Sequence, residues 1–185
     1  MPLTNLDAVA ALVVIDLQKG IMALPTVHPA SEIARKSGEL ARAFRAHNLP
    51  VVLVNVSGAP PGRTEAGARS LPVADDWKAL APELDRQPGD YQVTKRQWGA
   101  FHGTTLHEYL RQRGATQIVL AGISTSRGVE STARAAHEHG YNVVLVVDAM
   151  TDTDGQAHIN SIERIFPRLG EITTAGEVLD RLSRR

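Results

Sequence analysis

An aspartate and a lysine are the first candidates for chemistry, because each follows a strand-like segment. Asp16 comes directly after the apolar run VAALVVI, and Lys95 follows the extended segment 91–94. A carboxyl group beside a strand buried on both faces is costly to ionise unless it is paired, so it can act as a general acid or base. Position alone equally allows Asp16 to be a helix cap or a salt-bridge partner. Lys95 gains significance only as the partner of Asp16.

A third candidate is the segment AGISTSRGVESTARAA, residues 121–136, where a strand runs through a turn of small residues directly into a helix. Backbone N–H groups exposed at such a turn can bind an anion or a developing oxyanion. The alternative is that its serines and threonines only cap the helix. Ser124 and Ser126 are weak nucleophile candidates, because no histidine base is evident beside either in the sequence.

Composition excludes several classes of function. The chain has no cysteine, which rules out disulfides and thiolate nucleophiles. Its 20 basic and 20 acidic residues cancel, so we expect a small-molecule substrate, with no nucleic acid or membrane as a partner. The histidines show no metal-binding spacing, so we expect neither a metal nor a cofactor. Without a basic leader or a long apolar run, a cytoplasmic location is expected.

Elements that would position these residues alternate along the chain. Strands are expected at 9–15, 51–56, 91–94, 117–121, 142–147 and 171–173. Helices are expected at 31–47 with Ser31 as N-cap, at 77–84, 104–113, 129–139 and 158–166, and in a last helix ending at 182. This alternation predicts a single α/β domain over 1–185, with a parallel sheet and helices on both faces. Ligands of such sheets bind at the carboxyl ends of the strands, where we expect Asp16 and Lys95 on adjacent strands.

One long segment, 57–72, is rich in Gly, Pro and Arg and carries no periodicity. It is predicted to be a loop that acts as a lid or lies near an interface. Its arginines, Arg63 and Arg69, are candidates for contacts with a substrate carboxylate.

Four motifs in order resemble the isochorismatase-like hydrolases over nearly the whole chain: VVIDLQ, KRQWGAFHGT, AGISTSRGVESTAR and DAMTD. The resemblance implies a Rossmann-like three-layer sandwich with a six-stranded parallel sheet. Many members have an Asp, Lys, Cys triad, and Asp16 and Lys95 match its first two positions. The cysteine position falls on Gly128, which excludes the covalent thioester mechanism. The metal-binding motif of nicotinamidases is also absent, because VNVSG stands in its place.

Isochorismatases proper resemble this chain in having glycine at that position, and they hydrolyse a vinyl ether without a covalent intermediate. By this likeness Asp16 is the proton donor, Lys95 positions it, and Gly128 completes the catalytic set. The implied substrate-binding residues are Gln18, Trp98, Phe101, Ser124 and Arg127; for Trp98 and Phe101 the alternative is core packing, and for Arg127 a solvent-facing position.

The resemblance further implies a cis peptide between Ile123 and Ser124, which would aim the Ser124 and Gly128 N–H groups into the pocket. A non-proline cis bond costs about 3–4 kcal/mol and is usually kept for function. The resemblance also implies a homo-oligomer, a dimer or a tetramer. Ser57 stands where isochorismatases have glutamine, so the substrate remains open.

The leading interpretation is therefore a thiol-independent hydrolase that acts on a small carboxylate-bearing molecule, with isochorismate as one example. Two alternatives stay open. One is a family member without catalytic activity that binds a ligand or a protein. The other is an amidohydrolase that uses Asp16-activated water and releases ammonia.

Overall fold

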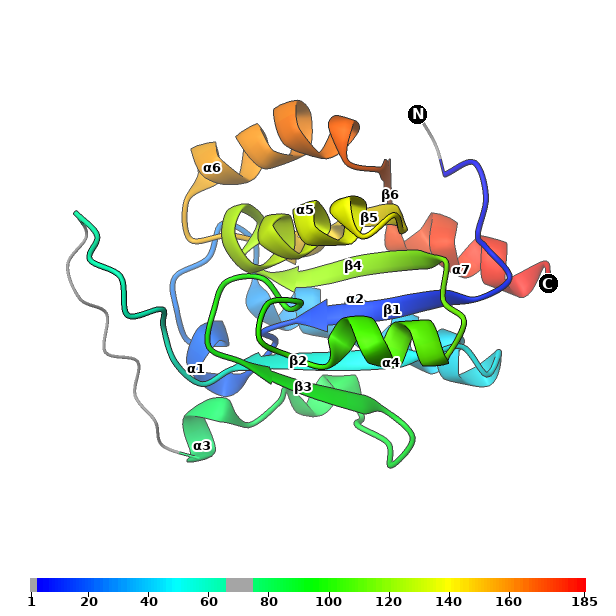
Figure 1. Ribbon diagram of the computed structural model, residues 1–185, viewed down its shortest axis with the longest axis horizontal. Helices are drawn as coiled ribbons and strands as arrows, with labels where there is room; N and C mark the ends of the chain where they lie inside the picture. Colours follow the sequence, from blue (N-terminus) through cyan, green and yellow to red (C-terminus); the bar gives the residue numbers. More distant parts are fainter. Residues whose placement is uncertain (1–2, 66–74) are drawn as a thin grey trace.

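A parallel β-sheet forms the centre of the protein in the computed structural model, which describes residues 3–65 and 75–185 (Figure 1). Within these residues six strands pair in the order β3-β2-β1-β4-β5-β6, and every pair is parallel. The strands are β1 (Ala10–Ile15), β2 (Val51–Val56), β3 (Tyr91–Lys95), β4 (Gln117–Ile123), β5 (Asn142–Thr151) and β6 (Glu171–Thr173). Every residue of β1, β2 and β4 is buried, as their β-branched, apolar sequences predict for central strands.

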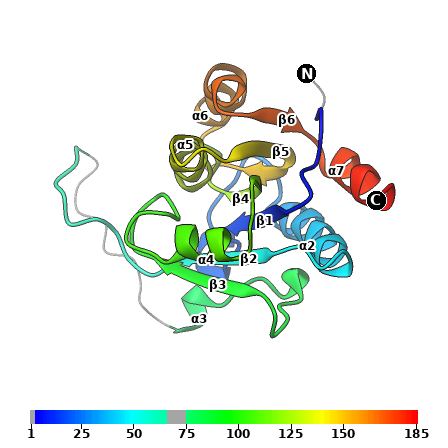
Figure 2. The same ribbon diagram turned by 45° about the vertical axis from the view of Figure 1, so that its right-hand side comes forward.

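Helices cover both faces of the sheet, which gives three layers (Figure 2). The helices are α1 (Lys19–Met22), α2 (Ala30–Ala46), α3 (Asp75–Lys78), α4 (Leu106–Gln112), α5 (Glu130–Glu138), α6 (Gly155–Asn160) and α7 (Ala175–Ser183). Short helical turns occur at Pro82–Leu84, Thr125–Val129, Ser161–Ile165 and Phe166–Arg168. Apolar side chains of α2 and α7 form the core on one face, and those of α4 and α5 form the core on the other.

The fold class and the six strands predicted from the sequence are confirmed, and several boundaries are corrected. Helix α2 begins at Ala30 with Pro29 before it, so Ser31 is not its N-cap. The single helix expected at 77–84 is two short pieces, because Leu80 between them pairs with Gln18 in an antiparallel bridge. The helix expected at 158–166 starts earlier, at 155, where the Asp154 side chain caps it.

Two further differences concern the carboxyl edge of the sheet. Strands β4 and β5 extend beyond their predicted ends, to Ile123 and Thr151. The short helix α1, just after the first strand, was not predicted. Part of the loop expected at 57–72, including Arg69, lies outside the described residues.

Candidate functional site

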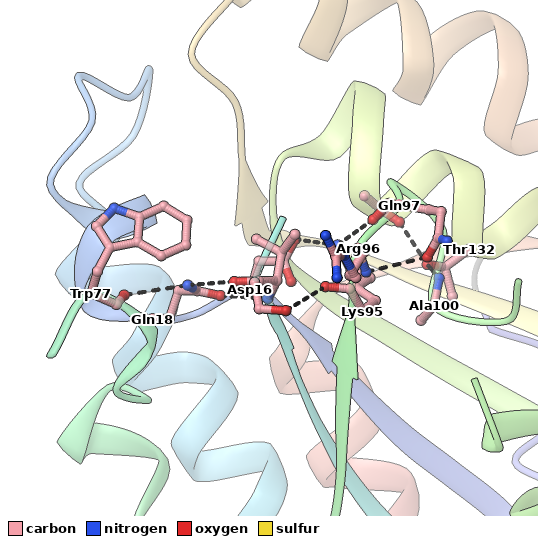
Figure 3. Close-up of polar contacts among 11 residues, drawn as sticks. Asp16, Gln18, Trp77, Lys95, Arg96, Gln97, Ala100 and Thr132 are labelled. Atoms are coloured by element: carbon pink, nitrogen blue, oxygen red, sulfur yellow. Dashed lines mark hydrogen bonds and ion pairs between the residues drawn. The ribbon is translucent and has the colours of Figure 1, made fainter. Parts of the chain in front are cut away.

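The carboxyl ends of β1, β3 and β4 carry the three segments that the sequence indicated. Strand β2 lies between β1 and β3, so the expectation that Asp16 and Lys95 end adjacent strands is wrong. Their side chains meet across the end of β2, because Lys95 is long enough to span one strand (Figure 3). The two polar groups therefore meet as predicted, but they do so through the length of the Lys95 side chain and not because their strands are adjacent.

Asp16 and Lys95 form a buried ion pair. Lys95 Nζ lies 2.6 Å from Asp16 Oδ2, and the two side chains are 1% and 8% exposed, respectively. Lys95 Nζ also donates to the Gln97 carbonyl at 3.2 Å. Asp16 Oδ1 is buried and has no hydrogen-bond partner among the described residues. One carboxyl oxygen is thus paired with the Lys95 ammonium, and the other accepts no hydrogen bond from the described residues.

This environment sets the protonation of Asp16. Burial raises the pKa of the Asp16 carboxyl from 3.8 to about 6, and the neighbouring Lys95 ammonium opposes this rise without cancelling it. Asp16 also adopts a left-handed backbone conformation, with φ of 50°, which is uncommon for a residue other than glycine. Strained residues of this kind cluster at functional sites. A group with a pKa near 6 can both donate and accept a proton close to neutral pH.

The turn after β4 supplies the opposite wall of the site. The Ile123–Ser124 peptide is cis, and residues Thr125–Val129 form one π-helical turn before α5. Asp152, which is fully buried, accepts hydrogen bonds from Ser126 N at 2.7 Å and from Ser126 Oγ at 2.8 Å. Ser126 therefore donates both of these hydrogen bonds to Asp152, and its hydroxyl donates to no histidine among the described residues.

Gly128 faces the Asp16 carboxyl. A Cβ atom placed on Gly128 would lie 3.3 Å from Asp16 Oδ2 and 2.9 Å from Ile15 Cγ2. Any side chain at this position would therefore stand directly against the acid. Because Gly128 has no side chain, this space remains open to the cavity.

A cavity of about 130 Å³ opens in front of these groups. It is lined by the charged residues Asp16, Lys95 and Arg127, by an apolar set and by a few small or polar residues. The apolar set is Ile21, Leu24, Val56, Ala59, Pro60, Trp98 and Ile123, and the remaining lining residues are Gly58, Gln97, Ser124 and Gly128. The cavity wall therefore combines three charged side chains with a larger number of apolar ones.

Three of the five predicted substrate-binding residues line this cavity. Ser124 and Arg127 do so from the turn after β4, and the Arg127 guanidinium approaches the Thr153 hydroxyl at 3.4 Å. Trp98 lines the cavity and is 56% exposed, so the core-packing alternative is wrong for this residue.

The other two, Phe101 and Gln18, are corrected. Phe101 lies in the core on the α4 and α5 face, 7% exposed, with its ring 5.1 Å from that of His139. The Gln18 amide is fully buried and bonded to main-chain atoms: Oε1 accepts from Val56 N at 2.7 Å, and Nε2 donates to the Val56 and Trp77 carbonyls at 3.1 and 3.3 Å. Gln18 therefore links the end of β2 to α3 and is not among the residues that line the cavity.

Asp152 and Thr132 are site-supporting residues that the sequence reasoning missed. Asp152 belongs to the DAMTD motif and Thr132 to the long turn motif, so the motifs contained both without indicating what they do. Thr132 is fully buried on α5, and its hydroxyl bonds to main-chain atoms of two segments of the site (Figure 3). Such side chain to main chain bonds depend on tertiary proximity, which sequence spacing does not give.

Residues 3–65 and 75–185 contain no group of three or more His, Asp or Glu side chains arranged to hold a metal ion. In the same part of the chain, no helix is both long and apolar enough to cross a bilayer.

The chain is similar to known proteins of one family along most of its length. The Isochorismatase domain family model matches residues 10–177. The chain is 42% identical over 181 residues to the isochorismatase family protein YecD of Escherichia coli O157:H7, covering 93% of this chain and 95% of YecD. It is 28% identical over 184 residues to maleamate amidohydrolase of Pseudomonas putida, covering 93% of this chain and 86% of that enzyme. An isochorismatase family protein from Burkholderia thailandensis has a similar structure, with a TM-score of 0.94, 45% identity, and 97% and 98% of the two chains covered.

Proposed function

The chain belongs to the isochorismatase family of hydrolases, and from this premise we propose that it hydrolyses a small carboxylate-bearing substrate with Asp16 as general acid and without a nucleophilic thiol. The observation that carries the proposal is the buried Asp16 carboxyl. It lines the cavity, its Oδ2 is held by Lys95 at 2.6 Å, and burial raises its pKa to about 6. A carboxyl group with this pKa retains a donatable proton near neutral pH.

Hydrolysis of a vinyl ether, such as that of isochorismate, fits an acid without a nucleophile. Asp16 transfers its proton to the methylene carbon, and the adjacent carbon becomes an oxocarbenium ion that the new Asp16 carboxylate stabilises. Water adds to that carbon and returns a proton to Asp16. The resulting hemiketal collapses to pyruvate and an alcohol. Every proton is accounted for by Asp16 and water.

Gly128 supports a mechanism that proceeds without covalent catalysis. The chain has no cysteine, and we take Gly128 to occupy the position where the thiol-dependent members of the family have theirs. The geometry is consistent with this placement, because a Cβ at Gly128 would face Asp16 Oδ2 at 3.3 Å. Without a side chain there, the substrate or a water molecule can approach the acid directly.

The cavity favours a small, partly apolar anion. Arg127 provides a guanidinium that can bind a carboxylate through two hydrogen bonds, and Lys95 adds positive charge beside Asp16. Trp98 and the aliphatic residues of the wall suit an unsaturated or planar hydrocarbon part. A volume of about 130 Å³ is below the roughly 300–1,000 Å³ typical of sites for drug-sized ligands, which favours a metabolite of low mass.

Amide hydrolysis is a second candidate, favoured by the similarity to maleamate amidohydrolase along most of the chain. In this reaction the ionised Asp16 would act as a base and take a proton from water that attacks the amide carbon. Asp16 then returns this proton to the leaving nitrogen, and the C–N bond breaks to give ammonia and a carboxylic acid, which ionises. A pKa of about 6 leaves most Asp16 ionised at pH 7, which also suits a base.

The test is incubation of the purified protein with isochorismate and with a panel of small amides and ureides, with pyruvate and ammonia assayed in parallel. Asp16→Asn, which keeps the size of the side chain and removes the acid, is the matched variant. We expect pyruvate from the wild type and none from Asp16→Asn. Ammonia that depends on Asp16 would move the protein to the amidohydrolase candidate. Turnover that persists in Asp16→Asn would refute both mechanisms.

A further inference from the structure

Thr132 joins the two walls of the candidate site. Its hydroxyl donates to the Gly128 carbonyl at 2.6 Å, one turn earlier in the helical segment. The same oxygen accepts from the Ala100 backbone N–H at 3.1 Å, in the loop that follows Lys95 (Figure 3). Thr132 is fully buried, so water does not compete for either bond. Both hydrogen-bonding roles of one hydroxyl are thus used to join segments that are far apart in sequence.

The two walls also approach closely beside this joint. A Cβ atom placed on Gly99 would lie 3.3 Å from the Ser131 carbonyl oxygen, so the loop packs against α5 backbone to backbone. The separation of the walls at this point is therefore fixed by main-chain contact and by the Thr132 hydroxyl. Trp98, one residue before Gly99, lines the cavity from the same loop.

The loop in turn holds the lysine. Lys95 Nζ donates to the Gln97 carbonyl at 3.2 Å and to Asp16 Oδ2 at 2.6 Å. A continuous path of bonds therefore runs from Thr132 through the Ala100 amide and the loop backbone to Gln97, and then through Lys95 to the acid. A shift of the loop would move the Gln97 carbonyl and release one of the two bonds that orient the ammonium group.

We propose that Thr132 is a positioning residue for the hydrolysis, whose hydroxyl holds the Lys95 loop against the Gly128 turn and so fixes the lysine on Asp16. The inference rests on the proposed function, in which Asp16 is the acid. Thr132 touches neither the cavity nor the reacting groups, and it acts only through Ala100 and Gly128.

The experiment compares Thr132→Val, which keeps the shape and removes the hydroxyl, with Thr132→Ser, which keeps the hydroxyl. Thr173→Val is the matched control, because Thr173, on the edge strand β6, is also buried and its hydroxyl donates to the Glu177 carboxylate. The first readout is the Asp16 carboxyl titration followed by carbon-13 NMR, which requires no turnover. The second is kcat and KM on the substrate found with the wild type.

In Thr132→Val the lysine is less well held, so we expect the pKa of Asp16 to rise from about 6 to about 7. We expect kcat/KM to fall about tenfold, mainly through kcat, because the acid and its partner are misplaced. Thr132→Ser should restore both values. Thr173→Val should lower the melting temperature and leave the Asp16 titration unchanged.

An unchanged Asp16 titration and kcat in Thr132→Val, with only a lower melting temperature, would overturn the proposal and reduce Thr132 to a structural residue. If Thr132→Val does not fold, as judged by circular dichroism, Thr132→Ala takes its place with the same expected results. Failure of the proposed function is separately visible. In that case Asp16→Asn retains turnover, while the titration still reports whether Thr132 positions the lysine.

Discussion

Replacing Gly128 with alanine tests whether the site depends on a bare backbone opposite the acid. The added methyl group would meet Ile15 Cγ2 at 2.9 Å, Asp16 Oδ2 at 3.3 Å and the Ile123 carbonyl oxygen at 3.5 Å. The first of these distances is shorter than van der Waals contact, so Ile15 or the turn must move. The second places a methyl group directly against the carboxyl oxygen that Lys95 holds.

The expected loss of stability follows from two opposing effects. Overpacking against Ile15 costs about 1–3 kcal/mol, and replacing glycine in a helical segment returns about 0.5–1 kcal/mol. The free energy of unfolding of Gly128→Ala, measured with urea, should therefore fall by about 0–2.5 kcal/mol. Activity should fall further, with kcat/KM at least about tenfold lower, because the substrate can no longer approach Asp16 closely.

Gly176→Ala is the matched control, because Gly176 lies in α7 and no atom is within 4 Å of the Cβ that alanine would add. This variant should be about 0.5–1 kcal/mol more stable than the wild type and fully active. If Gly128→Ala behaves like Gly176→Ala in both measurements, then position 128 does not abut the acid and the proposed role of its missing side chain is wrong.

Three further predictions concern Asp16, Gln18 and Arg127. Because the pKa of Asp16 is raised from 3.8 to about 6 in the folded protein, protonation of Asp16 stabilises the fold. This contribution to the free energy of unfolding is fully present below about pH 4 and is lost as the pH rises through about 6. At 1.36 kcal/mol per pKa unit, the urea-unfolding free energy of the wild type should fall by about 3 kcal/mol across this window relative to Asp16→Asn, and parallel curves would contradict the assignment. Gln18→Leu loses the bonds to Val56 and Trp77 and should destabilise the protein by about 2 kcal/mol or more in the same assay, whereas an unchanged value would show that the amide ties nothing together. Arg127→Gln should raise KM for a carboxylate substrate about tenfold with kcat little changed, and an equal loss in kcat would instead give Arg127 a role in the transition state.

The sheet was predictable because its central strands are short, apolar and β-branched, with helical segments between them. Burial on both faces is visible in such a sequence, and alternation with helices predicts parallel pairing. The position of β2 between β1 and β3 was not predicted, since strand order depends on crossover connections that leave no local signal. The meeting of Asp16 and Lys95 was nevertheless expected, because both follow strands at the same edge of the sheet.

Side chains around the site were predicted less well than the sheet. Trp98 and Phe101 stand three residues apart in one loop, and only Trp98 reaches the cavity, because the loop turns Phe101 into the core beside His139. Gln18 follows the acid by two residues, and its amide is nevertheless used by main-chain groups of β2 and α3. Each of these outcomes depends on contacts between distant segments, which a single sequence does not specify.

Carbon-13 NMR titration of the Asp16 carboxyl in the free wild-type protein shows directly whether burial keeps this group protonatable near neutral pH, despite the lysine beside it. We expect a titration midpoint at about pH 6. A midpoint near 3.8, the ordinary value for an aspartate, would contradict it, because Asp16 would then be a permanently charged ion-pair partner with no proton to donate.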